Sequence, residues 1–87
     1  MIHLEFLGHI KTSMGSEAMD VPKDHISVDE LFGFLLSSKP EAVEHGFTKY
    51  NTLLVLNGGE VFSASSQTGR RLNDGDTVLL VPFSHGG

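Results

Sequence analysis

Cysteine is absent from this chain of 87 residues. Its absence excludes a disulfide scaffold, a cysteine nucleophile, an iron–sulfur cluster and a zinc site built on thiolates. The chain also lacks any apolar stretch as long as a membrane span, and its first five residues, MIHLE, lack the basic start of a signal peptide. We therefore expect one cytoplasmic domain that has no membrane partner.

Basic residues are scarce. The chain has six lysines and arginines against eleven acidic residues, a formal net charge of −5, and its only adjacent basic pair is Arg70-Arg71. Since binding to nucleic acid requires a basic patch that neutralises phosphates, this composition argues against a DNA partner. An acidic surface suits docking on a basic partner protein, although solubility alone explains the charge equally well.

Motifs for catalysis or metal binding are also missing. No Ser–His–Asp arrangement and no glycine-rich phosphate loop is evident. Asp74 and Asp76 resemble a calcium loop only superficially, because its other ligands are missing, and they are typical turn formers. The histidines fall on separate predicted elements, without the close spacing of a metal motif: His3, His9, His25, His45 and His85. We therefore expect no metal site, no bound cofactor and no catalysis by this chain alone.

The first part of the chain predicts two strands. Residues 2–7 alternate between apolar and polar side chains, as a half-buried strand does. The segment from Gly8 to Gly15 has the composition of a turn region. Residues 17–22 form a second candidate strand, with Met19 and Val21 facing inward. Together these segments predict an N-terminal hairpin.

A helix is predicted at about residues 28–37. Ser27 and Glu30 form a capping box, in which each side chain accepts from the backbone of the other residue. Apolar residues follow at helical spacing: Val28, Leu31, Phe32 and Leu35. Gly33 weakens the helix, and we hypothesise that its missing side chain permits close packing on a sheet. Pro40 ends the helix, because the residue before a proline disfavours helical backbone.

The second half of the chain consists of apolar strands and turns. Residues 52–56 are a continuous apolar run, which predicts a buried strand, and an Asn-Gly-Gly turn then leads into a short return strand at 60–62. Residues 63–69 have the composition of a loop. A second turn, at residues 73–76, precedes a last strand at 77–83 whose core is apolar on both faces.

These elements together predict an α+β domain at residues 1–83, with one main helix packed on one face of a mixed sheet of four or five strands. The first and last strands are the most apolar, and we expect them to form the central pair. The predicted core consists of Leu4, Phe6, Leu31, Leu35, Leu54, Leu56, Val78 and Leu80.

The sequence ends with Gly86-Gly87. Two glycines pack against nothing, but a free Gly-Gly carboxylate is thin enough to thread into a narrow active site where any Cβ would clash. The carboxylate of Gly87 is therefore the predicted reactive group, at the end of a flexible tail of residues 84–87. The alternative is a frayed terminus without a role, since chain ends are usually disordered.

Three C-terminal segments carry a family resemblance. Residues 54–58, LVLNG, are similar to a strand that leads into a turn, and residues 72–78, LNDGDTV, are similar to a Leu-x-Asp-Gly-Asp-x-Val segment. Pro82 and then Gly86-Gly87 follow at the expected offsets. In this order, and with the element order above, they resemble the ubiquitin-like β-grasp family and, within it, the MoaD/ThiS sulfur carriers. The His-Gly-Gly ending is more like that of the eukaryotic ubiquitin-related modifier.

The resemblance implies an activation chemistry at Gly87. A ubiquitin-activating-type adenylating enzyme would use ATP and Mg²⁺, which this chain itself does not bind, to form a C-terminal acyl-adenylate. A sulfurtransferase would then supply sulfur and leave a thiocarboxylate. In the leading interpretation the chain is the small, non-catalytic subunit of a molybdopterin-synthase-type complex in molybdenum cofactor biosynthesis, and its tail enters a larger catalytic subunit.

Two other functions are open. A ubiquitin-like modifier would undergo the same adenylation and would then be joined through Gly87 to lysines of target proteins, or would carry sulfur for tRNA thiolation. A β-grasp adaptor would only bind its partners, and its Gly-Gly ending would be incidental.

The residues assigned to threading of the tail into a partner are Pro82, Phe83, Ser84, His85 and Gly86. Pro82 would stiffen the point where the strand becomes the tail, and Gly86 would adopt whatever backbone angles the partner's channel requires. His85 could hydrogen-bond in that channel. Phe83 would either anchor the base of the tail in a partner pocket or complete the core.

Overall fold

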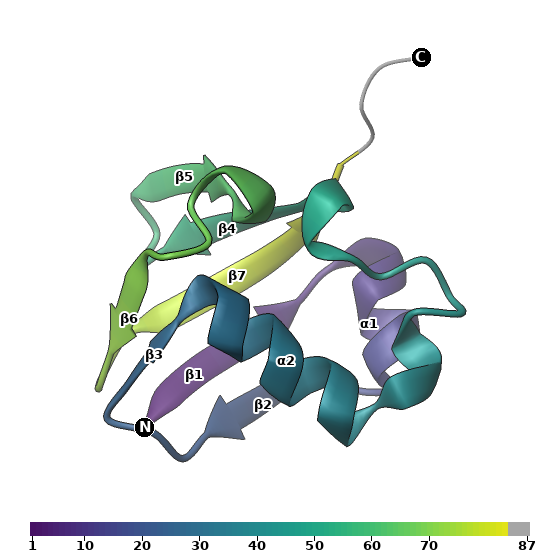
Figure 1. Cartoon of the computed structure of the whole chain (residues 1–87), viewed down its shortest axis with the longest axis horizontal. Coiled ribbons are helices and arrows are strands. Elements are labelled where there is room, and N and C mark those ends of the chain that lie inside the picture. Colours follow the sequence, from purple (N-terminus) through teal and green to yellow (C-terminus); the bar gives the residue numbers. More distant parts are fainter. Residues whose placement is uncertain (84–87) are drawn as a thin grey trace.

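The computed structural model describes residues 1–83. Within them the chain forms seven strands: β1 (Ile2–Phe6), β2 (Ala18–Val21), β3 (His25–Ser27), β4 (Thr52–Leu56), β5 (Glu60–Ser63), β6 (Arg71–Asn73) and β7 (Thr77–Pro82). The same residues form two α-helices and three short 3₁₀ turns: α1 (Gly8–Met14), α2 (Val28–Ser38), η1 (Pro40–Ala42), η2 (Lys49–Asn51) and η3 (Ala64–Ser66). Figure 1 shows α2 lying across one face of the main sheet.

Five strands form the main sheet, in the order β2-β1-β7-β4-β5. β1 and β7 are parallel, with His3 opposite Thr77, whereas the other neighbours in this sheet are antiparallel. β7 is the middle strand and β1 lies beside it, so the expected pairing of the first and last strands within the sheet is confirmed. The mixed sheet and its main helix confirm the predicted α+β, ubiquitin-like β-grasp fold.

Helix α2 begins where the sequence predicts. The Ser27 N–H donates to Glu30 Oε1 at 3.0 Å, and the Glu30 N–H donates to Ser27 Oγ at 3.1 Å. The pKa of Glu30 is lowered mainly by the hydrogen bond from the Ser27 backbone, because this bond stabilises the charged carboxylate. The apolar stripe of α2 is buried: Val28, Leu31, Phe32 and Leu35. Capping and amphipathic spacing therefore determine this helix together.

The core lies between α2 and one face of the main sheet, which we call the closed face. The predicted core residues that are buried are Leu4, Phe6, Leu31, Leu35, Leu54, Val78 and Leu80. Leu56, which was also predicted, is only half-buried and packs against the margin of the core.

Residues 8–15 are not the predicted turn region, because residues 8–14 form α1 and Gly15 is its C-cap. The helix ends at Gly15, whose N–H donates to the carbonyls of Lys11 and Thr12. Its buried side chains recur at helical spacing: Ile10, Ser13 and Met14. The prediction was wrong because a seven-residue helix without a side-chain N-cap has few signals in the sequence. β1 and β2 still pair antiparallel as predicted, but α1 joins them in place of a turn.

A second sheet of two strands was not predicted. β3 and β6 pair antiparallel, and buried Ile26 lies opposite buried Leu72. Each strand has three residues, which is too few for alternation to be visible. The predicted loop at 63–69 is wrong in part, since β5 extends to Ser63 and the following η3 turn buries Ala64.

Two further expectations are wrong. The apolar run at residues 52–56 does not make β4 a strand that is buried on both faces, because alternate residues of β4 are partly exposed. Gly33 does not allow close packing on the sheet, since a Cβ built on it would meet no atom within 4 Å. β7 also ends at Pro82, so Phe83 lies just beyond the strand.

Candidate functional site

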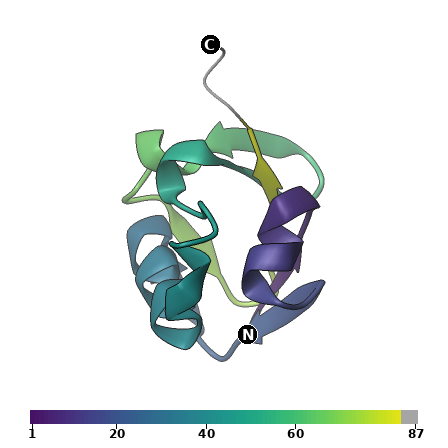
Figure 2. The same ribbon diagram turned by 90° about the vertical axis from the view of Figure 1, so that its right-hand side faces the viewer.

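The predicted reactive end of the chain follows β7. This middle strand runs to the top of the molecule, where the described chain stops (Figure 2). Four residues assigned to the tail and its activation lie outside the described residues: Ser84, His85, Gly86 and Gly87. The structure therefore describes the base of the tail, Pro82 and Phe83, and the surfaces around it.

On one side, the base of the tail lies against the loop between β1 and α1. The Leu7 N–H donates to the carbonyl of Leu80 at 3.1 Å, and this bond extends the pairing of β1 with β7. Gly8 has a φ of +56°, and a Cβ built on it would lie 2.8 Å from Pro82 Cγ. Both the backbone angle and the contact require glycine at this position, so the loop fits closely against Pro82.

On the other side, the η2 turn holds the base of the tail. The Phe83 N–H donates to the carbonyl of Asn51 at 2.9 Å. Asn51 is itself fixed, because its Nδ2 donates to the Gly46 carbonyl at 2.6 Å and its Oδ1 accepts from the Thr48 N–H at 3.1 Å. Phe83 is half-buried and does not belong to the buried core. The two sides together fix the direction in which the chain leaves the sheet.

The face of the main sheet opposite α2, which we call the open face, carries an apolar patch. Alternate residues of β4, β5 and β7 form this open-face patch: Leu53, Val55, Val61, Leu79 and Val81. Val55 lies opposite both Val61 and Leu79, and Leu53 lies opposite Val81, so the patch is continuous across three strands. Val61 is 58% exposed, and the other four are half-buried. A contiguous exposed apolar patch is typical of a protein contact site.

Charged side chains border the patch on β1 and β2. Glu5 lies opposite Leu79 in the β1–β7 pairing. His3 Nδ1 lies 2.8 Å from Asp20 Oδ1, and His3 Nε2 lies 3.4 Å from Glu5 Oε2. The pKa of His3 is raised above 6.5, the ordinary value for histidine, mainly by the hydrogen bond with Asp20. The open face therefore has an apolar half on β4, β5 and β7, and a charged half on β1 and β2.

The described residues bring together no cluster that suggests bound metal. Within residues 1–83, no three His, Asp or Glu side chains lie close enough to hold a metal ion. None of the helices in this part of the chain is long and apolar enough to cross a membrane. Within residues 1–83, this end of the molecule consists of the fixed end of β7 beside the apolar half of the open face.

Three parts of the site were missed by sequence reasoning: Gly8, Asn51 and the open-face patch. Gly8 was assigned to a turn, and nothing in the sequence signals that its loop reaches Pro82. The patch was missed because β4 and β7 are apolar on both faces, so their sequences give no alternation that separates inside from outside.

No family model matches the chain, and no curated protein matches it in sequence. Solved structures do match it. Small archaeal modifier protein 1 from Haloferax volcanii is 20% identical, with 99% of this chain and 98% of the other covered and a TM-score of 0.65. A chain of the Amycolatopsis orientalis BexX/CysO complex is 17% identical, with 100% of both chains covered and a TM-score of 0.71. A protein from Pyrococcus furiosus assigned as molybdopterin converting factor subunit 1 is 18% identical, with 95% and 97% covered and a TM-score of 0.66.

These structures match this chain over nearly its whole length, although few residues are identical. They support the β-grasp architecture that the element order and the C-terminal segments indicate. At such identities the similarity establishes a shared architecture. The chain therefore has the ubiquitin-like β-grasp fold that these small proteins share.

Proposed function

We propose that this protein is a sulfur carrier whose C-terminal carboxylate, at Gly87, is converted to an acyl-adenylate and then to a thiocarboxylate. The observation that carries the proposal is the position of the tail base. The middle strand of the sheet brings Pro82 to one end of the molecule, where the Gly8 loop and the Asn51 carbonyl hold the chain. The Gly86-Gly87 ending follows this fixed point within a few residues.

In this proposal the chain is a substrate and not a catalyst. A carboxylate is a poor electrophile, so an adenylating enzyme that binds ATP and Mg²⁺ joins the Gly87 carboxylate to AMP and releases pyrophosphate. Sulfide supplied by a sulfurtransferase then attacks the carbonyl carbon, AMP leaves, and the thiocarboxylate remains. Its sulfur is a stronger nucleophile than the carboxylate oxygen, which suits transfer to an acceptor.

The open-face patch is the proposed docking surface for the adenylating enzyme. Val81 belongs to the patch and directly precedes Pro82, so a partner that covers the patch also reaches the base of the tail. Glu5 and Asp20 on the charged half suit basic residues at the rim of the partner. Apolar contact at the centre and charge at the rim is the usual arrangement of a protein interface.

The leading recipient of the sulfur is a molybdopterin-synthase-type complex, in which a larger subunit takes the tail. The likeness to the Pyrococcus furiosus protein supports this assignment. The second candidate is a modifier that is joined through Gly87 to lysines of target proteins, and the likeness to small archaeal modifier protein 1 supports it to the same degree.

Exchange of labelled pyrophosphate into ATP tests the activation step. The protein, its cognate adenylating enzyme and ATP are expected to support exchange, whereas removal of Gly87 or addition of one residue after it abolishes exchange. Within residues 1–83 the buried core runs from Ile2 to Leu80, and chain ends usually contribute little packing, so neither change is expected to lower the unfolding temperature. Normal exchange by the extended variant would rule out a reactive terminus at Gly87.

Mass spectrometry of the protein from its own cells separates the candidates. A carrier is expected to gain the mass difference between sulfur and oxygen on its C-terminal peptide, and a modifier is expected to be linked to lysines of other proteins. Because oxidation of Met1, Met14 or Met19 adds nearly the same mass, the increment must be assigned by fragmentation. A native chain that continues beyond Gly87, or one that carries neither change, would favour the adaptor.

A further inference from the structure

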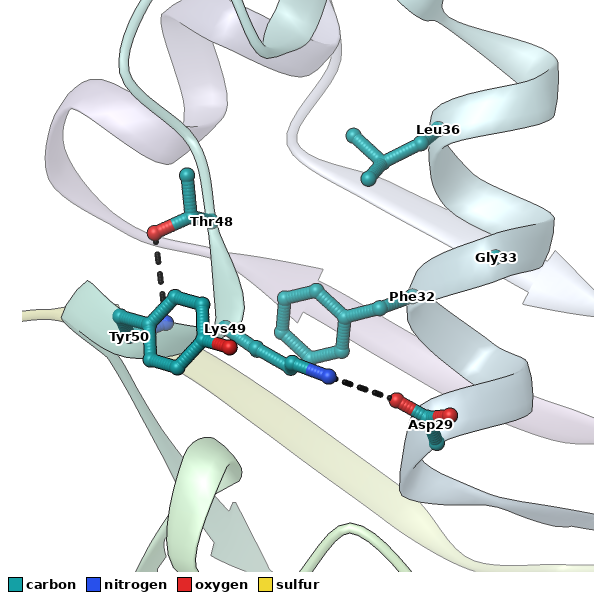
Figure 3. Close-up of a pocket in the computed structure, with 7 residues that line it drawn as sticks. All are labelled: Asp29, Phe32, Gly33, Leu36, Thr48, Lys49 and Tyr50. Atoms are coloured by element: carbon teal, nitrogen blue, oxygen red, sulfur yellow. Dashed lines mark hydrogen bonds and ion pairs between the residues drawn. The ribbon is translucent and has the colours of Figure 1, made fainter.

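A groove lies between α2 and η2, away from the open face. Its volume is about 360 Å³, and its lining includes Asp29, Phe32, Gly33, Leu36, Lys49 and Tyr50 (Figure 3). Figure 3 shows the Phe32 and Leu36 side chains pointing from α2 toward the η2 segment, and the Lys49 side chain reaching across to Asp29. This volume suits one bulky side chain and its neighbours better than a whole folded element.

Gly33 leaves the helix side of the groove open. Glycine within a helix costs about 1 kcal/mol relative to alanine, and such a residue usually has a packing or functional reason. Packing is not the reason here, because a Cβ built on Gly33 would meet no atom of residues 1–83 within 4 Å. The missing side chain therefore leaves space for a group from outside the protein.

The aromatic walls of the groove are partly rigid and partly exposed. The Phe32 ring stacks on buried Phe47 with a centroid distance of 5.3 Å, so it cannot turn away from the groove freely. Tyr50 is 62% exposed, while its backbone N–H donates to Thr48 Oγ1 at 3.2 Å. An exposed tyrosine beside a fixed apolar wall is typical of a contact that a partner side chain completes.

The charge at the end of the groove favours a cation. Lys49 Nζ donates to Asp29 Oδ1 at 2.9 Å, and the lysine side chain is 29% exposed whereas the aspartate side chain is 61% exposed. An approaching group therefore meets the carboxylate more readily than the ammonium. Glu30, the next residue of α2, is also largely exposed, but its Oε1 lies 3.8 Å from Arg71 Nη1, so Asp29 is the carboxylate that the groove offers.

The groove and the base of the tail share the η2 turn. Lys49 and Tyr50 lie in η2, and Asn51, the last residue of the same turn, accepts the hydrogen bond from the Phe83 N–H. One 3₁₀ turn thus forms a wall of the groove and a support of the tail. A protein that surrounds the tail on this side reaches the groove without leaving the surface.

We propose that the groove binds a segment of the protein that receives the tail. An aromatic or large aliphatic side chain of that segment enters between Phe32, Leu36 and Tyr50, and a neighbouring lysine or arginine pairs with Asp29. The partner's identity rests on the proposed function, but the chemistry of the bound segment rests on the groove alone.

A peptide titration tests the groove independently of sulfur transfer. The probes are acetyl-Ala-Phe-Lys-Lys-Ala-amide and its acidic counterpart acetyl-Ala-Phe-Glu-Glu-Ala-amide, added to the full chain labelled with ¹⁵N. The basic peptide is expected to shift the amide signals of Gly33, Leu36 and Tyr50 at millimolar concentration, and the acidic peptide to bind several-fold more weakly. In Asp29→Asn, which leaves Lys49 without its carboxylate, the preference is expected to reverse.

Equal binding of the two peptides, or no binding of either, would overturn the proposal. Shifts of the same amides that grow with the protein's own concentration would also overturn it, because they would assign the groove to a second copy of the chain.

Gly33→Leu fills the groove and gives a second test. The variant is expected to abolish the peptide shifts while it maintains or raises Tm, since leucine is a better helix former than glycine. With the larger subunit that receives the tail, the KM for this protein in the transfer step is expected to rise about tenfold with kcat unchanged. Gly59→Leu is the matched control, because a Cβ on Gly59, in the β4–β5 turn, also meets no atom within 4 Å.

The two proposals fail in different ways. Peptide binding without any pyrophosphate exchange would support the groove proposal and contradict the sulfur-carrier function. Normal pyrophosphate exchange, together with peptide shifts that Gly33→Leu leaves undiminished, would contradict the groove proposal and support the sulfur-carrier function.

Discussion

The two faces of the main sheet are made from alternate residues of the same strands, yet they differ in burial and in the role that we propose for them. One row across the closed face is buried throughout: Phe6, Leu80, Leu54 and Phe62. The neighbouring row on the open face is partly or largely exposed: Glu5, Leu79, Val55 and Val61. Apolar residues occur in both rows, so apolar character does not separate a residue that stabilises the fold from one that binds a partner. The face on which it lies makes that distinction.

The largest expected effect is the loss of a closed-face side chain. Leu80→Ala removes a fully buried side chain from the middle strand and is expected to lower the free energy of unfolding by about 2–5 kcal/mol. Leu79→Ala, the same change one residue away on the open face, is expected to cost less than half as much. Urea denaturation measures both values. Equal losses of unfolding free energy in the two variants would show that the two faces are packed alike, and would contradict the difference between them.

A smaller loss of stability is expected at the base of the tail. Gly8→Ala places a Cβ 2.8 Å from Pro82 Cγ and puts alanine in a left-handed conformation, whose backbone cost alone is about 1–2 kcal/mol. Pro82→Ala removes the atom that clashes. The double variant is therefore expected to be more stable than the sum of the single changes predicts, as a double-mutant cycle in urea would measure. Strict additivity would mean that the loop and Pro82 are not coupled.

An open-face substitution is expected to separate binding from stability. Val61→Lys replaces an exposed patch residue on the edge strand β5, so the free energy of unfolding is expected to change by less than about 0.5 kcal/mol. The KM for this protein in pyrophosphate exchange is expected to rise about tenfold, because a charge enters the apolar contact. Val61→Thr, which keeps the shape of the side chain, is the control. An unchanged KM for Val61→Lys would remove β5 from the docking surface.

The smallest expected effect is a pH dependence on the charged half of the open face. Asp20 raises the pKa of folded His3, so this interaction stabilises the protein below about 6.5, the unfolded value. Its contribution is lost as the pH rises through the folded pKa. NMR titration is expected to show a lower His3 pKa in Asp20→Asn, and the stability difference between the two proteins is expected to shrink with rising pH. A His3 pKa that Asp20→Asn leaves unchanged would contradict the assignment.

Local signals made parts of the fold predictable. The capping box at Ser27 and Glu30 and the apolar spacing after it placed α2 within one residue of its observed end. Alternation in β1 separated its two faces correctly. In contrast, α1 has no side-chain cap, and β3 and β6 are short enough that only their mutual pairing identifies them as strands. Such elements depend on contacts between distant residues, which one sequence does not display.

The residues of the proposed tail could be assigned from the sequence, whereas the contacts that hold its base could not. Pro82 and the Gly-Gly ending are visible as residues, so the tail could be assigned directly. The contact of Gly8 with Pro82 and the bond from Phe83 to Asn51 depend on the sheet order, which brings three distant segments together. The groove beside α2 depends on the path of residues 39–47, which returns the chain to the helix at η2. No local pattern encodes that path.

The parallel pairing of β1 with β7 has a consequence for how this chain folds. The pairing joins nearly the first residues of the domain to nearly the last, so the middle of the sheet cannot close until almost the whole chain is available. Closure over so long a loop carries an entropic cost before any contact compensates for it. Such long-range topology favours folding that is slower than the microseconds to milliseconds of helical bundles. During synthesis on the ribosome, β1 is expected to pair first with β2, and its other edge stays unpaired until β7 has been made.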